Sequence, residues 1–230
     1  MTKSNEEIIK KLYELADEEY RKFHSGLCPN TNNIIGVRIP RLREIAKQIA
    51  KQQAQEFLEK IDDRYYETIM LYGMVIGYMK ANLEEIQKYL DVFVPKIDNW
   101  AVCDCCSSTY KFTNKNLNEM WKYIQKYINS DKEFEVRFAV VMLMDYYLND
   151  QYIDKVLSVL SKIKHEGYYV KMAIAWLVSV AFVKNEEKTR RFLINNPLDD
   201  FTYNKALQKI IESNRVEKKV KNEIRKMKRK

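Results

Sequence analysis

Apolar residues recur every three or four positions along most of the chain, which is the spacing typical of amphipathic helices. Only five glycines and four prolines interrupt this pattern, whereas Lys, Glu, Leu and Ile are abundant and favour helices with short connections. The sequence therefore predicts an all-α fold of about a dozen helices. The predicted helices include residues 4–23, 55–60, 64–80, 134–148, 151–163, 168–183, 186–193, 203–213 and 216 onward.

Polar residues at the predicted helix starts indicate where side chains cap the backbone. Residues 4–7 and 130–133 have the spacing of capping boxes. Asp98 is predicted to cap a helix that carries Trp100 and Asp104, which share one face because they lie four positions apart. An aromatic ring and a carboxylate then point the same way, which makes this stretch the best candidate for chemistry.

Two of the predicted helices are similar in sequence. Residues 136–143 and 170–177 match in character at an offset of 34, and the Trp100 helix lies 37 positions before the first of them. A period in the thirties with paired helices predicts a solenoid of helical repeats, a single domain over residues 1–230 with a concave groove lined by equivalent helices. Trp100, Arg137 and Trp176 are expected to converge on that groove.

The charge of the chain is concentrated at its end. The formal net charge is +8, and residues 215–230 hold nine Lys or Arg and two Glu, so the preceding 214 residues hold 31 basic and 30 acidic side chains. Net charge alone therefore says little about a nucleic-acid surface on the body. The segment at about 215–230 is either a basic arm that contacts phosphates or a solvated final helix.

Several classes of protein do not fit the composition. No run of about 18 apolar residues exists and the N-terminal residues are polar, so neither a membrane span nor a signal peptide is expected, and the default location is the cytoplasm. The four cysteines, at positions 28, 103, 105 and 106, are too few and too clustered for a disulfide framework. His24 and His165 are remote in sequence, so no metal site is expected.

Four segments, taken in order, resemble those of a known family. They are Ile35-Gly36-Val37-Arg38-Ile39-Pro40-Arg41-Leu42-Arg43, Trp100 to Asp104, Arg137 in Val136-Arg137-Phe138, and Trp176 in Lys171-Met172-Ala173-Ile174-Ala175-Trp176. Together they resemble the AlkD-like DNA alkylation repair glycosylases, which are built from HEAT-like repeats. The resemblance covers nearly the whole chain.

The resemblance implies an activity and roles for individual residues. The implied activity is hydrolysis of the N-glycosidic bond of cationic N3- and N7-alkylated purines in double-stranded DNA, by a monomer without a cofactor and without a base pocket. Asp104 corresponds to the catalytic carboxylate, and Trp100 and Trp176 to the aromatics that face the deoxyribose. The expected DNA-backbone contacts are Arg137, Arg38 and Lys171.

The chemistry of that reaction suits these residue types. An alkylated purine already carries positive charge, so it departs without a general acid, and cationic character then grows on the sugar. A carboxylate such as Asp104 stabilises that charge and orients the attacking water, an electrostatic effect worth roughly 3–4 kcal/mol. Indole faces attract a cation by about 0.5–2 kcal/mol each. The guanidinium of Arg137 provides a planar donor for a phosphate.

Each of these residues also has a structural interpretation. Trp176 lies among apolar neighbours in the sequence, where a core tryptophan is the commoner case. Asp104 is compatible with a surface carboxylate paired with Lys111 or Lys115. Arg137 has aromatic and aliphatic neighbours and therefore requires a specific anionic partner, which is a phosphate or Asp104 itself.

The chain departs from the family pattern at two places. Ala101 stands where the family commonly has an acidic residue, and residues 177–179 are Leu, Val and Ser where it has a basic one. These changes make the expected DNA surface less charged. Two other functions therefore stay open, namely a non-catalytic binder of damaged or branched DNA and a helical-repeat scaffold for protein interactions.

Overall fold

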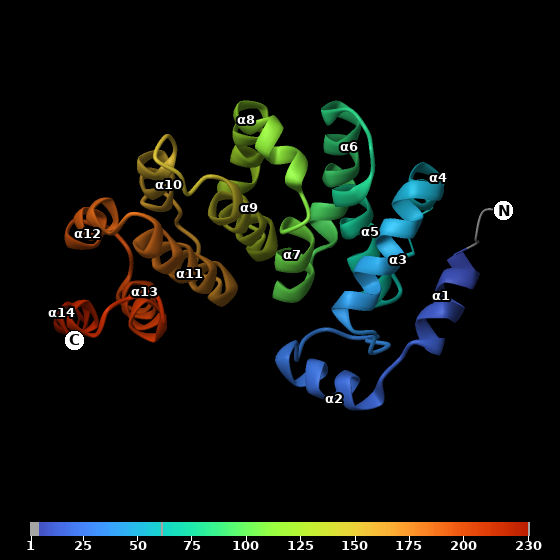
Figure 1. The fold of residues 1–230 in the computed structure, drawn as a ribbon, viewed down its shortest axis with the longest axis horizontal. Coiled ribbons are helices and arrows are strands. Elements are labelled where there is room, and N and C mark those ends of the chain that lie inside the picture. The colour runs from blue at the N-terminus through green and yellow to red at the C-terminus, as the bar shows by residue number, and fades with distance from the viewer. Residues whose placement is uncertain (1–4, 61, 230) are drawn as a thin grey trace. The chain divides into compact units, whose positions relative to one another are not determined.

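All regular secondary structure in the described residues, 5–60 and 62–229, is helical in the computed structural model (Figure 1). Fourteen α-helices and two 3₁₀ helices follow one another within these ranges. The predicted all-α fold class is confirmed. The contacts between helices divide the chain into two compact units, Met1–Tyr123 and Ile124–Lys230. The expectation of a single domain stays a prediction.

The first unit is organised around helix α5 (Tyr66–Tyr78), in which every residue from Tyr66 to Ile76 is buried. This helix packs against α3 (Ile39–Gln52) and α7 (Trp100–Ser107), so the three form a stacked layer. Helices α4 (Ala54–Glu59) and α6 (Leu83–Phe93) also pack against α5. The other helices that begin in this unit are α1 (Asn5–Glu14), α2 (Glu18–Leu27), η1 (Val94–Lys96), η2 (Lys111–Lys115) and α8 (Leu117–Ile128).

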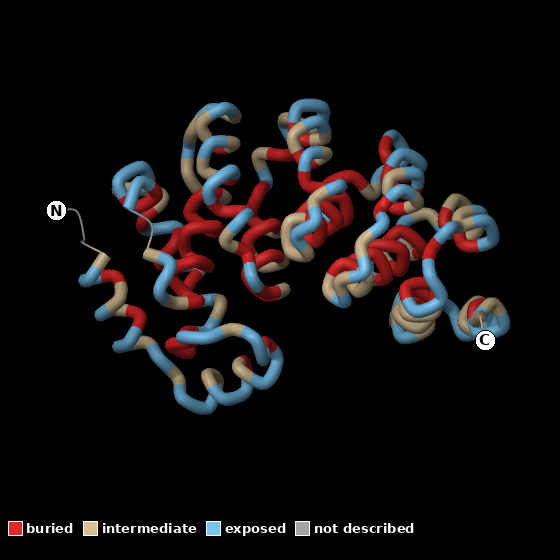
Figure 2. The backbone as a smooth tube through the Cα atoms, turned by 180° about the vertical axis from the view of Figure 1, so that it is seen from behind, coloured by how far each residue is buried: buried red, intermediate tan, exposed pale blue. Residues whose placement is uncertain are grey.

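The second unit has the same arrangement around helix α11 (Tyr168–Lys184). This helix packs between α9 (Glu133–Tyr146) and α13 (Asp200–Glu212). Helices α10 (Ile153–Leu160) and α12 (Glu186–Ile194) pack against α11 as well. Buried positions concentrate in the stacked helices, and exposed positions are frequent on the covering ones (Figure 2).

In each unit three odd-numbered helices stack, α3, α5 and α7 in the first and α9, α11 and α13 in the second, and even-numbered helices cover them, which is a helical-repeat fold. The period of 34 arises because α9 and α11 are successive members of one stack. The predicted helical-repeat class is confirmed. None of the helices in the described ranges is long and apolar enough to cross a membrane.

The basic C-terminal segment is folded onto the second unit. Helix α14 (Lys218–Lys226) packs against α13 and buries Ile224. Arg229 follows it, donates from Nη1 to the carbonyl of Leu198 at 2.7 Å and pairs with Asp200 at 3.2 Å. The segment is therefore a packed final helix within the described residues.

The predicted helix over residues 4–23 is wrong, because two helices occupy this region. Helix α1 ends at Glu14, and Asp17 caps α2 by accepting from the backbone N–H of Tyr20 at 2.9 Å. The backbone N–H of Asp17 donates to the carbonyl of Gly36 at 3.0 Å. The break between α1 and α2 therefore lets the chain bond to a loop that is distant in sequence.

Two predicted helix caps also differ from the structure. Asn99, and not Asp98, caps α7, since its side chain accepts from the N–H of Val102 at 2.9 Å. The hydroxyl of Ser130 accepts from the N–H of Lys132 at 3.1 Å, but α9 has no side-chain cap. The other predicted capping box includes Ser4, which lies outside the described residues.

Candidate functional site

Helix α7 presents a narrow accessible stripe. Of its residues only Trp100, Asp104 and Cys105 are not buried. Burial raises the pKa of the Cys105 thiol to about 11, so this thiol is neutral at physiological pH. Asp104 therefore supplies the only negative charge on the accessible stripe of α7, one helical turn from the indole of Trp100.

Trp100 is held by a hydrogen bond to a distant part of the first unit. Its indole Nε1 donates to the carbonyl oxygen of Leu27 at 3.0 Å. Leu27 is the last residue of α2, and its carbonyl has no partner further along that helix. The bond therefore satisfies a helix end and also fixes the orientation of the indole ring.

Arg43 fastens the end of α7 to the other stacked helices. Its Nη1 donates to the hydroxyl of Tyr78 at 3.0 Å, and its Nη2 donates to the hydroxyl of Ser108 at 3.1 Å and the carbonyl of Cys105 at 3.4 Å. One side chain of α3 thus contacts both α5 and the C-terminal end of α7. This brace limits the movement of the helix that carries Asp104.

Glu67 organises the loop that leads into α3. The side chain is fully buried, and its carboxylate accepts from the backbone N–H groups of Ile35 at 2.9 Å, Gly36 at 2.7 Å and Val37 at 3.2 Å. Burial raises the pKa of this carboxyl group, while the three amides favour its ionised form and oppose the rise. These bonds fix the path of the chain towards Arg38.

Gly36 in the same loop has a φ of +103°, which residues with a side chain rarely adopt. A Cβ at this position would lie 2.7 Å from Cβ of Arg21 and 2.9 Å from the carbonyl oxygen of Asp17. The glycine of the motif is therefore required by the close approach of the loop to α2.

The three cations expected to contact DNA already have partners within the protein. Arg38 pairs with Asp17 at 2.8 Å and lies over the ring of Tyr20, 5.0 Å from its centre. Lys171 pairs with Glu166 at 2.6 Å. Arg137 is 5% exposed, and its Nη1 donates to the carbonyl of Tyr169 at 2.8 Å, so it joins α9 to the start of α11.

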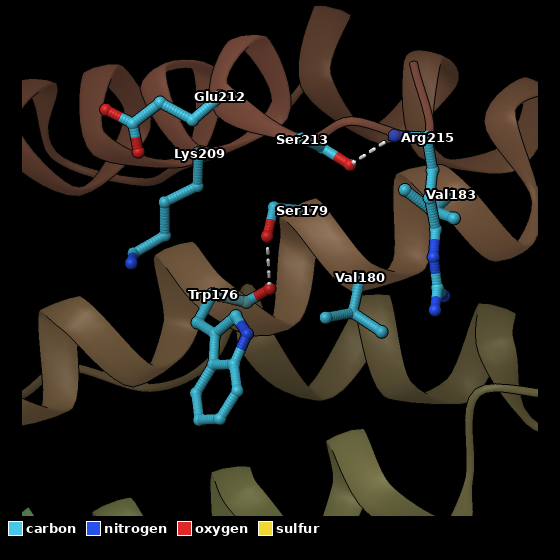
Figure 3. A pocket seen from close by; sticks show the side chains of 8 residues that line it. All are labelled: Trp176, Ser179, Val180, Val183, Lys209, Glu212, Ser213 and Arg215. Atoms are coloured by element: carbon cyan, nitrogen blue, oxygen red, sulfur yellow. Dashed lines mark hydrogen bonds between the residues drawn. The ribbon is translucent and has the colours of Figure 1, made fainter.

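Trp176 is not a core residue, because its side chain is 37% exposed. It lines an open groove of about 340 Å³ between α11 and α13 (Figure 3). The backbone carbonyl of Trp176 accepts from the hydroxyl of Ser179 at 2.7 Å. The structural interpretation of this tryptophan is therefore wrong, and its ring is available to a ligand.

The departures from the family pattern are buried, and all of them except Ser179, which lines the groove beside Trp176, pack in the core. Ala101 is 2% exposed, and Leu177 and Val178 are fully buried. An acidic or basic residue at these positions would lie in an apolar interior, where an unpaired charge is costly. The apolar residues at 101, 177 and 178 are therefore packing residues in this chain.

The sequence predicted no role for Arg43, Glu67 or Lys209, and it related Arg215 only to the basic segment at 215–230. The sequence holds a signal for a role of Glu67, because this carboxylate lies in an otherwise apolar helix, with Tyr66 before it and Thr68 and Ile69 after it. Lys209 and Arg215 line the groove beside Trp176, and no local pattern in the sequence relates them to it. Among the described residues no cluster of three His, Cys, Asp or Glu side chains is placed to hold a metal ion.

The two units each carry part of the predicted site. Trp100 and Asp104 lie together on α7 in the first unit, whereas Arg137 and Trp176 lie on α9 and α11 in the second. All three helices are members of the stacked layers. The expected convergence of the four residues stays a prediction.

The fold and these side chains define a class of protein, an all-α helical-repeat protein that exposes a tryptophan and a carboxylate together on a short stacked helix. The family model for DNA alkylation repair enzymes matches residues 8–210. The chain therefore belongs to the DNA alkylation repair enzyme family, and the predicted AlkD-like membership is confirmed. No curated protein matches the chain.

Proposed function

We propose that the protein is a DNA glycosylase that hydrolyses the N-glycosidic bond of cationic N3- and N7-alkylated purines in double-stranded DNA. One observation carries the proposal. In a chain of the DNA alkylation repair family, the accessible stripe of α7 consists of Trp100, the carboxylate of Asp104 and a thiol kept neutral by burial.

Asp104 acts in this proposal as the catalytic carboxylate. An alkylated purine leaves as a neutral base, so no proton is needed on the leaving group, and positive charge develops on the deoxyribose. A carboxylate fixed before the reaction stabilises that charge without reorganising, which is worth roughly 3–4 kcal/mol. It also orients the water that attacks the anomeric carbon. The bonds that Arg43 makes at the end of α7 support such fixation.

Trp100 and Trp176 bind the lesion-bearing nucleotide in this proposal. Each indole presents a π face to the cationic sugar and excludes water from it. Arg137, Arg38 and Lys171 contribute positive charge towards the DNA backbone. Each of the three side chains is held in place by a partner within the protein. In this proposal their main role is therefore to fix the orientation of the duplex.

The test is release of free base from methylated duplex DNA. The duplex carries N7-methylguanine or N3-methyladenine, and the released base is quantified by mass spectrometry. We expect release at least about a hundredfold faster than spontaneous depurination, the scale of one preorganised charge. An unmethylated duplex is the control and should release nothing above background.

The same experiment separates the other functions. Salt-dependent binding to methylated duplex without base release would contradict the glycosylase and indicate a non-catalytic binder of damaged DNA. An absence of duplex binding even at low salt would indicate a scaffold for protein interactions.

A further inference from the structure

The groove between α11 and α13 combines an apolar floor with an edge of positive charge. Its volume is about 340 Å³ and it lies wholly within the second unit. Trp176, Val180 and Val183 of α11 form the apolar side (Figure 3). Lys209 of α13 and Arg215, just beyond it, extend their side chains from the opposite side towards α11 (Figure 3).

These two cations differ from several paired basic residues of the same unit. In the part of the chain that the structure describes, neither Lys209 nor Arg215 has a side-chain hydrogen bond or an ion pair. By contrast, Lys171 pairs with Glu166, Arg190 with Glu223 and Arg229 with Asp200. The two cations of the groove therefore form no ion pair within the described protein.

Glu212 lines the groove as well, and in the described residues it forms no ion pair with Lys209 or Arg215. The carboxylate of Glu212 accepts from Nε2 of Gln208 at 2.8 Å, and Figure 3 shows it directed away from Trp176. The hydroxyl of Ser213 accepts from the backbone N–H of Arg215 at 3.2 Å, which sets where the Arg215 side chain leaves the turn. The side chains that line the groove thus carry two positive charges and one negative charge.

Resting on the proposed function, we propose that this groove binds the phosphodiester backbone of one DNA strand beside the lesion, with Lys209 and Arg215 on its phosphates. A nucleic-acid strand offers negative phosphates along one edge and apolar sugar faces along the other. The groove offers the complementary pair of surfaces. Lys209 supplies a point charge and Arg215 a planar donor that binds a phosphate through two N–H groups.

The test compares two doubly substituted proteins of equal net charge. The first carries Lys209→Gln and Arg215→Gln. The matched control carries Lys155→Gln and Lys162→Gln, two exposed lysines on or just after the covering helix α10. Duplex DNA with a tetrahydrofuran abasic analogue is the probe, and its affinity is measured across a series of salt concentrations.

The groove variant should lose salt dependence as well as affinity. We expect the slope of log K against log salt to fall by about 1.8, since each phosphate contact contributes about 0.9. The control should keep the slope of the unsubstituted protein. A charge-retaining variant, Lys209→Arg with Arg215→Lys, should restore most of it. Equal slopes for the groove variant and the control would overturn the proposal.

Base release distinguishes this inference from the proposed function. If the unsubstituted protein releases methylated purine and the groove variant binds and acts like the control, the groove proposal fails and the glycosylase stands. If no base is released but duplex binding depends on Lys209 and Arg215, the glycosylase fails and the groove stands.

Discussion

Trp100 and Trp176 both lie on stacked helices, yet the two units hold them differently. The indole N–H of Trp100 donates to the carbonyl of Leu27 at 3.0 Å, which fixes the ring. The indole N–H of Trp176 has no acceptor among the described residues, and that side chain is 37% exposed beside a groove. The first unit thus presents a fixed aromatic and the second an accessible one.

The difference extends to the charged groups around each tryptophan. In the first unit, Arg43 and Glu67 are committed to backbone and side-chain partners that support α7 and the loop before α3. In the second, Lys209 and Arg215 have no such partners in the described chain. Catalysis requires charge that is fixed in advance, whereas binding a strand benefits from cations that are free to meet phosphates. In the proposed function, the first unit therefore supplies the catalytic carboxylate, and the second supplies unpaired cations that hold the DNA backbone.

The largest expected effect on stability concerns the buried carboxylate of Glu67 in the first unit. Glu67→Ala removes the acceptor of three backbone N–H groups, and unsatisfied buried donors cost about 1–3 kcal/mol each, so we expect a loss of about 3 kcal/mol or more. Lys171→Met removes ion pairs to Glu166 and Asp199, whose side chains are both exposed, which should cost under about 1 kcal/mol. Urea denaturation measures the free energy of unfolding of both variants. Equal losses would contradict the difference between the two units.

A smaller effect is expected from the two tryptophans. Trp100→Phe keeps an aromatic ring but leaves the carbonyl of Leu27 without its donor, so stability should fall by about 1 kcal/mol. Trp176→Phe removes no hydrogen bond of the indole N–H in the described structure and should leave stability within about 0.5 kcal/mol. Thermal unfolding of the two variants side by side tests this, and an equal shift in both would show that Trp100 is no better fixed than Trp176.

The smallest effect is a pH dependence that belongs to the first unit. His24 is 5% exposed and stacks on Tyr20, the tilted ring of Tyr66 lies 5.0 Å from it between ring centres, and burial lowers its pKa. The unfolded chain, with a histidine pKa near about 6.5, then binds the proton more readily than the folded one. Its stability contribution is complete above that pH and falls as the pH decreases below it.

His24→Phe removes this titration while keeping an aromatic ring in the stack. Stability measured between about pH 5 and 7 should therefore vary less in the variant than in the unsubstituted protein. Parallel curves for the two proteins would show that His24 is not held in its neutral form.

Much of the fold could be predicted because helix periodicity is local. Stacked helices such as α9 and α11 carry repeated apolar patterns, so both their type and their period were readable. The break between α1 and α2 after Glu14 could not be predicted from the local pattern. It depends on hydrogen bonds of Asp17 with the carbonyl of Gly36 and the side chain of Arg38, which lie far along the chain. Local helix propensity depends only on neighbouring residues in the sequence, so it cannot predict such contacts.

The candidate site was predictable only in part. The four-residue spacing of Trp100 and Asp104 gave a shared helix face, and the accessible stripe of α7 contains both. The exposure of Trp176 was not predictable, because Ala173, Ile174 and Leu177 around it are buried, and the packing of α9 and α13 decides which side of α11 stays open. The role of the Glu67 carboxylate depends on a loop thirty residues earlier in the chain.

Single-turnover base release by Asp104→Asn tests the central claim most directly, because the amide keeps the shape of the side chain and removes its charge. With duplex DNA containing N7-methylguanine, we expect the rate of base release to fall by about 10²–10³, while affinity for the duplex stays near that of the unsubstituted protein. Undiminished release of methylated purine would contradict the claim that the Asp104 carboxylate performs the chemistry.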